Sequence, residues 1–494
     1  MNGKVRKFPK PHKRPKSPVG GVPGPRAMTA STGGSSLVRV TDELPTATIT
    51  VAVTRLADGT GSGLCSTGIP LPPGTLNPSE TAKVKVTISS VEQQIYVEAL
   101  SGLHSDGTVR SILVQFNISC DYGYPLSGTV EVGVGVTRGT EDISKTAVTW
   151  TTPVIVCLPT DPDYLVSCGL ILPTIPVADV PESPTEFGDY EDDFVTCGDV
   201  HWNADEISVY GIWNSNFYDR ALIWFTWWIR TGAVEYFRRG LIEAGAYMGW
   251  ASSTACSPRD SQQEGVELIY RLVGYDTAKT NLVTIANFLT TYYSAALDNT
   301  TSWADSRQQS RILLSKILCH RLGDTSKDWA ALAAADLTTI LTTQEVTGDY
   351  RMQAWDVIDP PPTYGHSPYM MGMLHDAFIK YYTWIDADSR IPPAIKLSLD
   401  WTWTNCWLSG DGSFMYVSDV CETGGLDPSP DLNQFNASIY SWYYWYSADS
   451  DYLTKAETIF ANGVNLCSIC GAQFKQFNEN YRQSAHHFVW RLGQ

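Results

Sequence analysis

The sequence predicts a multidomain protein in which an antiparallel β-barrel or sandwich is followed by an all-α ring of helical hairpins. Three observations lead to this fold class. The early part of the chain alternates between apolar and polar residues, and a helical period begins near residue 201. Aromatic residues are also unevenly divided, because 16 of 17 Trp and 20 of 25 Tyr follow residue 200. The 494 residues exceed the roughly 250–300 of a single core, so two or more domains are expected.

Residues 1–37 are predicted to form an extended basic arm and a hinge. The first 26 residues hold eight Lys or Arg and no acid, and four Pro between positions 9 and 18 disfavour a helix. No apolar segment accompanies the basic residues, so we expect no secretion signal and synthesis in the cytoplasm. The arm is interpreted either as a solubilising tail or as a docking arm for an acidic assembly partner.

Residues 38–158 are predicted to form the β domain. Turn dipeptides such as Asp58-Gly59 and Asp106-Gly107 separate segments in which apolar and polar residues alternate with period two. The expected strands are residues 38–40, 47–54, 82–88, 94–99, 109–116 and 128–136. Several short alternating strands favour an antiparallel sandwich or barrel.

Residues 159–200 are rich in Pro and acidic residues, and we predict a connector that packs along a surface. Residues 201–494 are predicted to be helical, with turns at intervals of roughly 40 to 60 residues, which correspond to about five or six helix pairs. A closed ring of pairs needs no capping repeat and encloses an aromatic cleft. Three motifs have the spacing of helix N-termini: Asn203-x-x-Glu206, Ser302-x-x-Asp305 and Thr325-x-x-Asp328.

Charge and cysteine content restrict the partners. The chain has a net charge of −17, and the residues after the arm carry 27 basic against 52 acidic side chains, so we do not expect nucleic acid as a partner. The longest strongly apolar stretch, Ala221–Ile229, is about half the ~20 residues of a membrane helix, so we expect no membrane span. The 11 scattered Cys are interpreted as buried thiols in a reducing cytosol, and no metal or cofactor is expected.

Several short motifs carry a resemblance to a known family. Gly68-Ile-Pro-Leu-Pro-Pro-Gly74 and Asp106-Gly-Thr-Val-Arg110 look like two elements of the N-terminal β-barrel domain of exo-rhamnogalacturonan lyases. Ser111 stands where that family has Trp. Phe217–Phe237 resembles the opening helix and turn of (α/α) toroids in polysaccharide lyases. Over residues 47–494 the resemblance implies a β-barrel, an (α/α) toroid and cleavage of an acidic polysaccharide by β-elimination.

The basic arm belongs to neither domain of that family. A toroid enzyme with such an arm and no secretion signal looks like a phage virion component, a tail depolymerase anchored by its arm. Two alternatives stay open: a non-catalytic virion structural or glycan-receptor-binding protein, and a glycoside hydrolase. An acidic or polar glycan and an assembly partner for the arm, such as a virion, are the expected partners.

A lyase needs a base, usually His or Tyr, and a cationic or amide group that stabilises the developing enolate. Tyr364 and His366 stand at the approach to a predicted helix that begins at Ser367, where His366 is either the base or a polar residue of the helix N-terminus. The catalytic candidates are His366, Tyr364, Tyr218 and Arg311.

Arg307 and Arg311 share a helix face, and Arg307 opposes the dipole of its first turn, so it is interpreted either as a carboxylate ligand or as half of a salt bridge. Asp219 and Arg220 form either a buried ion pair or a cleft pair. The remaining candidates are polar residues at helix entries or on one helix face, which are alternatively caps or packing residues. The substrate-binding candidates are Arg307, Asp219, Arg220, Asn433, Asn436, Lys475, Asn478, Tyr481 and Arg482. For the hydrolase alternative the candidate carboxylates are Asp219, Glu264 and Asp431.

Overall fold

The computed structural model describes residues 46–151, 154–253, 256–298, 305–350, 352–353, 364–365, 367–418, 426–471 and 474–493. The expected basic arm and the expected strand at 38–40 lie outside these residues.

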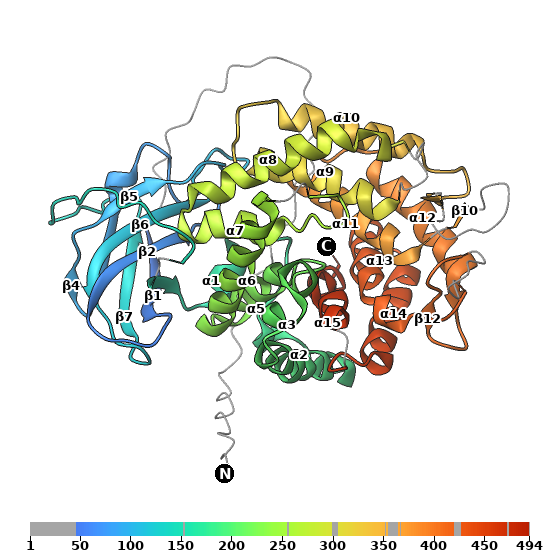
Figure 1. The fold of residues 1–494 in the computed structure, drawn as a ribbon, viewed down its shortest axis with the longest axis horizontal. Helices are drawn as coiled ribbons and strands as arrows, with labels where there is room; N and C mark the ends of the chain where they lie inside the picture. Colours follow the sequence, from blue (N-terminus) through green and yellow to red (C-terminus); the bar gives the residue numbers. More distant parts are fainter. Residues whose placement is uncertain are drawn as a thin grey trace, which may run out of the picture. The chain divides into compact units, whose positions relative to one another are not determined.

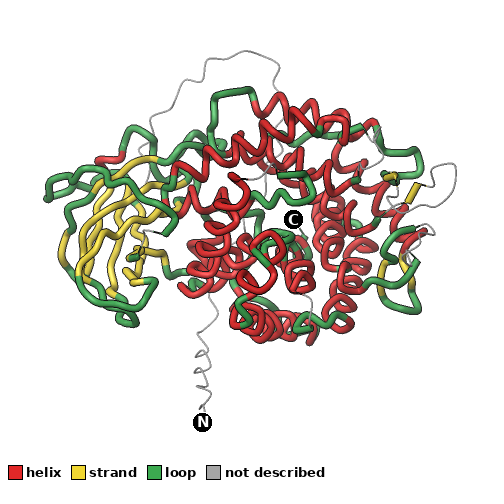
Figure 2. The backbone as a smooth tube through the Cα atoms, in the orientation of Figure 1, coloured by secondary structure: helices red, strands yellow, loops and turns green. Residues whose placement is uncertain are grey.

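Eight strands form one curled mixed sheet, a half-barrel, with the order β4-β3-β7-β1-β8-β2-β6-β5 (Figures 1 and 2). The strands are β1 (Ala47–Arg55), β2 (Ser62–Pro70), β3 (Val84–Ile88), β4 (Val91–Glu92), β5 (Tyr96–Ala99), β6 (Ser111–Ser119), β7 (Leu126–Val132) and β8 (Ile155–Pro159). All neighbours pair antiparallel except β2 and β8, which are parallel where Cys65 faces Ile155. The expectation of a purely antiparallel sheet was therefore wrong at this pair.

The alternating pattern missed β2 and β8 because neither strand has a solvent-facing side. The last six residues of β2 and all five of β8 are buried, so their sequences do not alternate. Helix α7 lies directly against β2, and a Cβ at Gly68 would lie 2.0 Å from the carbonyl oxygen of Arg271. Glycine is the residue that permits this approach of two backbones.

The rest of the described chain is mainly helical (Figure 2). The helices are α1 (Pro162–Ser167), α2 (Thr185–Asn203), α3 (Glu206–Tyr210), α4 (Ile212–Ser215), α5 (Arg220–Thr231), α6 (Val234–Ser253), α7 (Glu264–Val273), α8 (Asp276–Tyr292), α9 (Ser306–Arg321), α10 (Trp329–Thr342), α11 (Pro368–Trp384), α12 (Ile391–Cys406), α13 (Gln434–Ser447), α14 (Ser450–Leu466), α15 (Phe474–Tyr481) and α16 (His487–Trp490). Short elements between helices are β9 (Met352–Gln353), β10 (Tyr364–Gly365), β11 (Trp407–Leu408), β12 (Ser413–Phe414) and the 3₁₀ turn η4 (Pro430–Leu432).

Consecutive helices pack as antiparallel partners and then against the next pair. Helix α5 packs on α6, α7 on α8, α9 on α10, α11 on α12 and α13 on α14. Across the pairs, α5 contacts α7, α8 contacts α9, α9 contacts α11 and α11 contacts α13. Helix α2 contacts both α14 and α15, so the first long helix of this region lies beside the last ones (Figure 1).

The predicted connector at 159–200 was wrong over its last third, because α2 begins at Thr185. Phe187, Tyr190, Phe194 and Cys197 form its buried stripe at helical spacing, but exposed acidic residues between them hide the pattern. The expected helix start at Asn203 is instead the end of α2.

Two of the expected helix starts were displaced by three residues. The caps are the acidic members of the motifs: Asp305 accepts a hydrogen bond from the Gln308 amide at 2.7 Å, and Asp328 accepts one from the Ala331 amide at 3.0 Å. Aspartate is as good an N-cap as Ser, so spacing alone did not decide between them.

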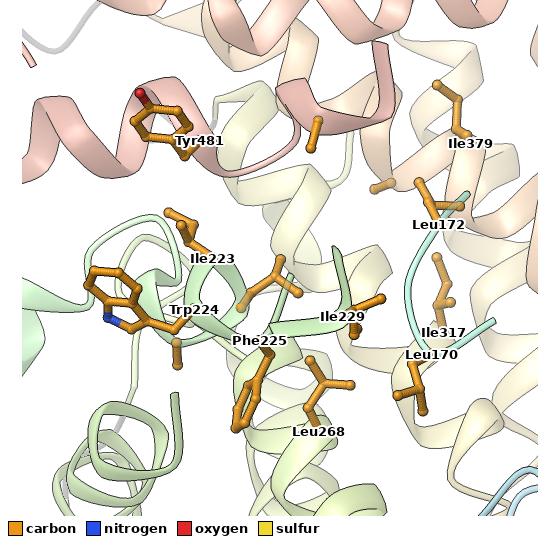
Figure 3. Close-up of a cluster of buried hydrophobic side chains, with 14 of the residues drawn as sticks. Leu170, Leu172, Ile223, Trp224, Phe225, Ile229, Leu268, Ile317, Ile379 and Tyr481 are labelled. Carbon is orange, nitrogen blue, oxygen red and sulfur yellow. The ribbon is translucent and has the colours of Figure 1, made fainter. Parts of the chain in front are cut away.

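Aromatic side chains fill the interfaces between helices. Every residue of α5 from Arg220 to Arg230 is buried, and Trp224, Trp227 and Trp228 are each at most 1 % exposed. The Trp227 ring stacks on Phe194 of α2 with centroids 3.6 Å apart. Figure 3 shows Trp224 and Phe225 projecting from α5 into this core. Burial of each such ring contributes roughly 1.5–3 kcal/mol, so most of the aromatic excess serves packing.

One expectation about cysteine was wrong. Cys197 of α2 and Cys470, which follows α14, form a disulfide with Cα atoms 4.8 Å apart. Cys470 therefore pairs across the fold and not with Cys467 of its own C-x-x-C motif. The other described cysteines are free thiols, and all of them except the half-buried Cys467 are buried, as expected.

Candidate functional site

Three tyrosines from separate segments converge at the N-terminal ends of α5, α11 and α13. Tyr218 lies two residues before the start of α5, and its ring centroid lies 5.1 Å from Phe435 in the first turn of α13. Tyr369 in the first turn of α11 lies 5.9 Å from Phe435 and 5.7 Å from Tyr416. We call Tyr218, Tyr369 and Tyr416 the tyrosine cluster. Tyr218 and Tyr369 are buried, while Tyr416 is half-buried and forms the accessible edge.

Tyr218 reaches this position through an unusual backbone. Tyr218 and Asp219 both have a φ of 66°, in the left-handed region that L residues avoid at a cost of order 1–3 kcal/mol each. Asp219 compensates by capping two helices at once, because its carboxylate accepts hydrogen bonds from Leu222 of α5 and from Glu264 and Gly265 of α7 at 2.8–3.3 Å. Asp219 therefore positions Tyr218.

Arg307 supplies a positive charge beside the cluster. It lies in the first turn of α9, and its guanidinium is 3.2 Å from Asp305. Burial opposes its charge, but Asp305, Tyr369 and Tyr218 hold the pKa of Arg307 above its usual value. Its Nε has no hydrogen-bond partner among the described residues. Arg307 therefore forms the salt bridge of one interpretation, and its Nε remains a free donor among the described residues; its role as a carboxylate ligand stays a prediction.

The tyrosine hydroxyls stay protonated at neutral pH. Burial, followed by the charge of Glu479, raises the pKa of Tyr218, and Arg307 opposes this rise. Burial raises the pKa of Tyr369 well above its usual value in the same way. Both phenols are therefore hydrogen-bond donors here, and the expectation that Tyr218 acts as a catalytic base finds no support in its electrostatics.

Glu479 of α15 is a member of the site that the sequence did not single out. Its side chain is 1 % exposed, its Oε2 has no hydrogen-bond partner among the described residues, and its Oε1 lies 3.9 Å from Nζ of Lys475. Burial raises the pKa of Glu479 well above 4.5, Lys475 opposes the rise, and Asp431 adds to it. Nothing in the run Phe477-Asn-Glu-Asn-Tyr481 distinguishes this buried acid from its polar neighbours.

Arg482 belongs to a buried ion network beneath the site. Its terminal nitrogens donate to Asp376 at 2.8 Å and to Glu264 at 2.7 Å, and Lys380 lies 2.6 Å from each of these carboxylates. All four side chains are buried, and both terminal nitrogens of Arg482 are already occupied. Arg482 and Glu264, candidates for substrate binding and for hydrolysis, are therefore placed as structural ions.

Arg311 lies one helical turn beyond Arg307 and is fully buried. None of its three guanidinium nitrogens has a hydrogen-bond partner in the described part of the chain. Burial lowers the pKa of Arg311 to about 10, with Asp219 and Glu264 opposing the decrease, so it is charged at neutral pH. Its charge acts on the buried carboxylates of Asp219 and Glu264 and not on an accessible surface.

Arg220 and Asn478 fix the segment that carries Tyr218. Arg220 does not pair with Asp219, contrary to one interpretation; it forms an ion pair with Glu206 and donates through Nε to Asn478 at 2.8 Å. Asn478 in turn donates to the carbonyl oxygen of Phe217 at 2.7 Å. Both side chains are buried and saturated by protein groups.

The remaining candidates divide between packing and the edge of the site. Tyr481 is buried and donates to the carbonyl oxygen of Tyr190 at 3.0 Å. Asn433 accepts from the Phe414 amide and donates to Gly412, so it ties β12 to α13. Asn436 is buried, and its amide nitrogen has no hydrogen-bond partner among the residues that the structure describes, while Lys475 has a half-exposed side chain.

His366 and the side chain of Tyr364 lie outside the described residues, so both remain predictions. Ser367, the next residue after His366, donates to the carbonyl oxygen of Tyr416 at 3.1 Å. The described chain on this side of the site is therefore joined to the tyrosine cluster.

An open hollow of about 390 Å³ lies elsewhere, lined by Lys145, Ala147, Val148, Gly274, Tyr275, Asp276 and Thr277. It contains none of the candidate residues, and its charged groups are engaged, since Lys145 lies 2.6 Å from Glu98. The chemistry of the tyrosine cluster is more convergent, so the cluster is the candidate site.

Within the described ranges, no group of three or more His, Cys, Asp or Glu has the arrangement of a metal site, and no helix has the length and apolar character needed to cross a membrane. Comparisons of the chain with family models, with curated proteins and with solved structures found no match.

Proposed function

We propose that the protein is a carbohydrate-active enzyme that cleaves an acidic polysaccharide by β-elimination at the tyrosine cluster. The observation that carries the proposal is the convergence of Arg307, Tyr218, Tyr369 and Tyr416 from four segments. Aromatic rings with polar handles suit sugar rings, and a permanently charged guanidinium suits a uronate carboxylate.

The architecture proposed around this site is an (α/α) toroid. The pairwise packing of successive helices and the contact of α2 with α14 and α15 support a closed ring. The first turns of α9, α11 and α13 meet Tyr218, which precedes the N-cap of α5, at the cluster, so several helix N-termini point to one region. Their dipoles favour a negatively charged ligand.

In the proposed reaction, Arg307 neutralises the uronate carboxylate and so stabilises the enolate that forms when the proton α to it is removed. Tyr218 and Tyr369 donate hydrogen bonds to the sugar. His366, which directly precedes Ser367 in the chain, is the proposed base.

Incubation with acidic polysaccharides tests this proposal. Ultraviolet absorbance of unsaturated uronate products is expected from the wild-type protein. Arg307→Met is expected to reduce kcat/KM by about 10²–10³-fold, the usual effect of losing one donor to a developing anion. Arg390→Met is the control, because the half-exposed Arg390 side chain pairs with Asp388 and donates to Thr338, both outside the candidate site. New reducing ends without that absorbance would indicate hydrolysis, and no cleavage would indicate a glycan-binding or structural virion protein.

The basic arm is proposed to dock this enzyme to an acidic assembly partner such as a virion. Its charge is opposite to that of the remaining chain, which holds 52 acidic residues. Removal of residues 1–36 is expected to leave the enzyme folded, by circular dichroism, while abolishing co-sedimentation with the partner. Unchanged co-sedimentation would refute the docking role.

A further inference from the structure

The carboxyl group of Glu479 is the one buried acid beside the tyrosine cluster that the described protein leaves with a free oxygen. Glu264 and Asp376 bind Lys380 and Arg482, and Asp219 caps two helices. Glu479 meets only Lys475, at 3.9 Å, and its Oε2 has no partner within the described residues. A buried polar atom without a partner requires an explanation, because desolvation costs roughly 1–3 kcal/mol.

The position of Glu479 links it to the proposed site. Its neighbour in the sequence, Asn478, donates to the carbonyl oxygen of Phe217 at 2.7 Å, which joins α15 to the residue before Tyr218. Glu479 is also, after burial, the next cause of the raised pKa of Tyr218. On its other side the half-exposed Lys475 lies within 4 Å, so the carboxyl group is close to the protein surface although it is covered.

We propose that Glu479 is the proton donor to the leaving glycosidic oxygen, a role that rests on the proposed β-elimination. The base removes the proton at C5 of the uronate, and that electron pair forms the C4–C5 double bond. The bond between C4 and the glycosidic oxygen breaks, and its electron pair stays on the oxygen. Glu479 donates its proton to this oxygen and becomes a carboxylate. The base then releases its extra proton to solvent, and Glu479 takes up a proton from solvent, so both groups return to their starting states. No water is consumed overall.

The electrostatics of the pocket suit this role. A donor must hold its proton at the working pH, and burial raises the pKa of Glu479 well above 4.5. The charged groups that act on it are Lys475 on α15, which opposes the rise, and Asp431 on η4, which adds to it; Tyr218, before α5, stays neutral. Burial and Asp431 together outweigh Lys475, so the protonated form is favoured.

Glu479→Gln tests the inference in the full-length protein. The variant preserves shape and removes the acidic proton, so kcat on acidic polysaccharide is expected to fall by about 10²–10⁴-fold with KM nearly unchanged. Wild-type activity should decline as the pH rises through the pKa of Glu479, because the proton donor then ionises; this decline is the alkaline limb of the pH profile. The residual activity of Glu479→Gln should not show this limb. Glu479→Asp should retain part of the activity and this alkaline limb. Glu457→Gln is the control, since Glu457 only pairs with Arg491 at the surface.

Stability measurements separate catalysis from folding. A raised pKa in the folded state means that wild-type stability declines as the pH rises from the unfolded value of the carboxyl group through the folded value. Glu479→Gln carries no charge at any pH, so it should melt at or above the wild-type temperature at alkaline pH. A melting temperature below that of the wild type there would contradict a protonated buried carboxyl group.

Each result decides the matter. Wild-type kcat in Glu479→Gln, with unsaturated products still formed, overturns this inference and leaves the proposed function standing. An equal loss in Glu457→Gln also overturns it. If the wild-type protein forms no unsaturated product from any acidic polysaccharide, both proposals fail together. Reduced kcat with an intact fold and a lost alkaline limb supports the donor role.

Discussion

Replacement of Arg482 by Met is expected to destabilise the protein strongly, because it leaves two carboxylates short of positive charge. Arg482 donates to Asp376 at 2.8 Å and to Glu264 at 2.7 Å, and its side chain is 0 % exposed. Of the two cations that form ion pairs with these acids, only Lys380 would then remain. Breaking a buried pair by removing one partner typically costs about 3–5 kcal/mol, and the apolar Met recovers only packing.

Urea unfolding followed by circular dichroism measures this cost. Arg390→Met is the matched control, since Arg390 forms a pair of similar length with Asp388, 2.7 Å, but its side chain is 48 % exposed. An exposed pair contributes about 0–1 kcal/mol. Equal and small losses in the two variants would refute the structural role of Arg482. If Arg482→Met instead lowered glycan affinity without loss of stability, Arg482 would be a substrate ligand.

The pH dependence gives a second check on the same network. Lys380 and Arg482 overcome the effect of burial and hold the pKa of Asp376 below its usual value. A lowered folded pKa contributes stability that is present above the unfolded value, about 4, and is lost as the pH falls below it. The wild-type protein should therefore lose stability in acid more steeply than Arg482→Met. Parallel acid limbs would show that Arg482 does not hold this pKa down.

Two further variants test packing. Gly102→Ala should destabilise the protein by several kcal/mol, because the new Cβ would lie 1.9 Å from the carbonyl oxygen of Arg321. Gly107→Ala is the control: Gly107 has the same φ of 83° but open space around it, so this variant should lose only the roughly 1–2 kcal/mol of a left-handed residue. Urea unfolding midpoints compare the two variants, and equal losses would contradict the close approach at Gly102. Cys197→Ser should cost about 2–5 kcal/mol under oxidising conditions by removing the Cys470 bridge, and reduced wild-type protein should then match it.

The sequence predicted those parts of the fold that have one exposed face. β1 alternates and was predicted to within one residue, and the helical character predicted after residue 201 agrees with the helices found there, although the first long helix, α2, begins earlier, at Thr185. β2 and β8 are buried along most of their length and so carry no alternation. Helix α2 was mistaken for a connector for a different reason: its exposed acidic residues give it the composition of a connector and hide its helical spacing.

Residues of the candidate site could be predicted only where the residue type disagreed with its local secondary structure. Arg307 stood out because its charge opposes the helix dipole, and it does lie beside Tyr218. Glu479 gave no such signal, since its burial depends on segments far away in the chain. Asn433 and Tyr481 have the residue types of a glycan site, but their partners are backbone groups.

Several candidates that do not reach the tyrosine cluster nevertheless control it. Tyr218 occupies a left-handed conformation that must be held, and the groups that hold it are Asp219, through two helix N-termini, and Asn478, through the Phe217 carbonyl. Substitution of either residue should displace Tyr218 and reduce activity as severely as loss of a substrate ligand. Activity alone therefore cannot separate the two kinds of residue. Unfolding free energy can, because a positioning residue that satisfies buried backbone groups must lose stability when it is replaced, whereas a ligand with a free donor, such as Arg307 through Nε, should lose affinity first.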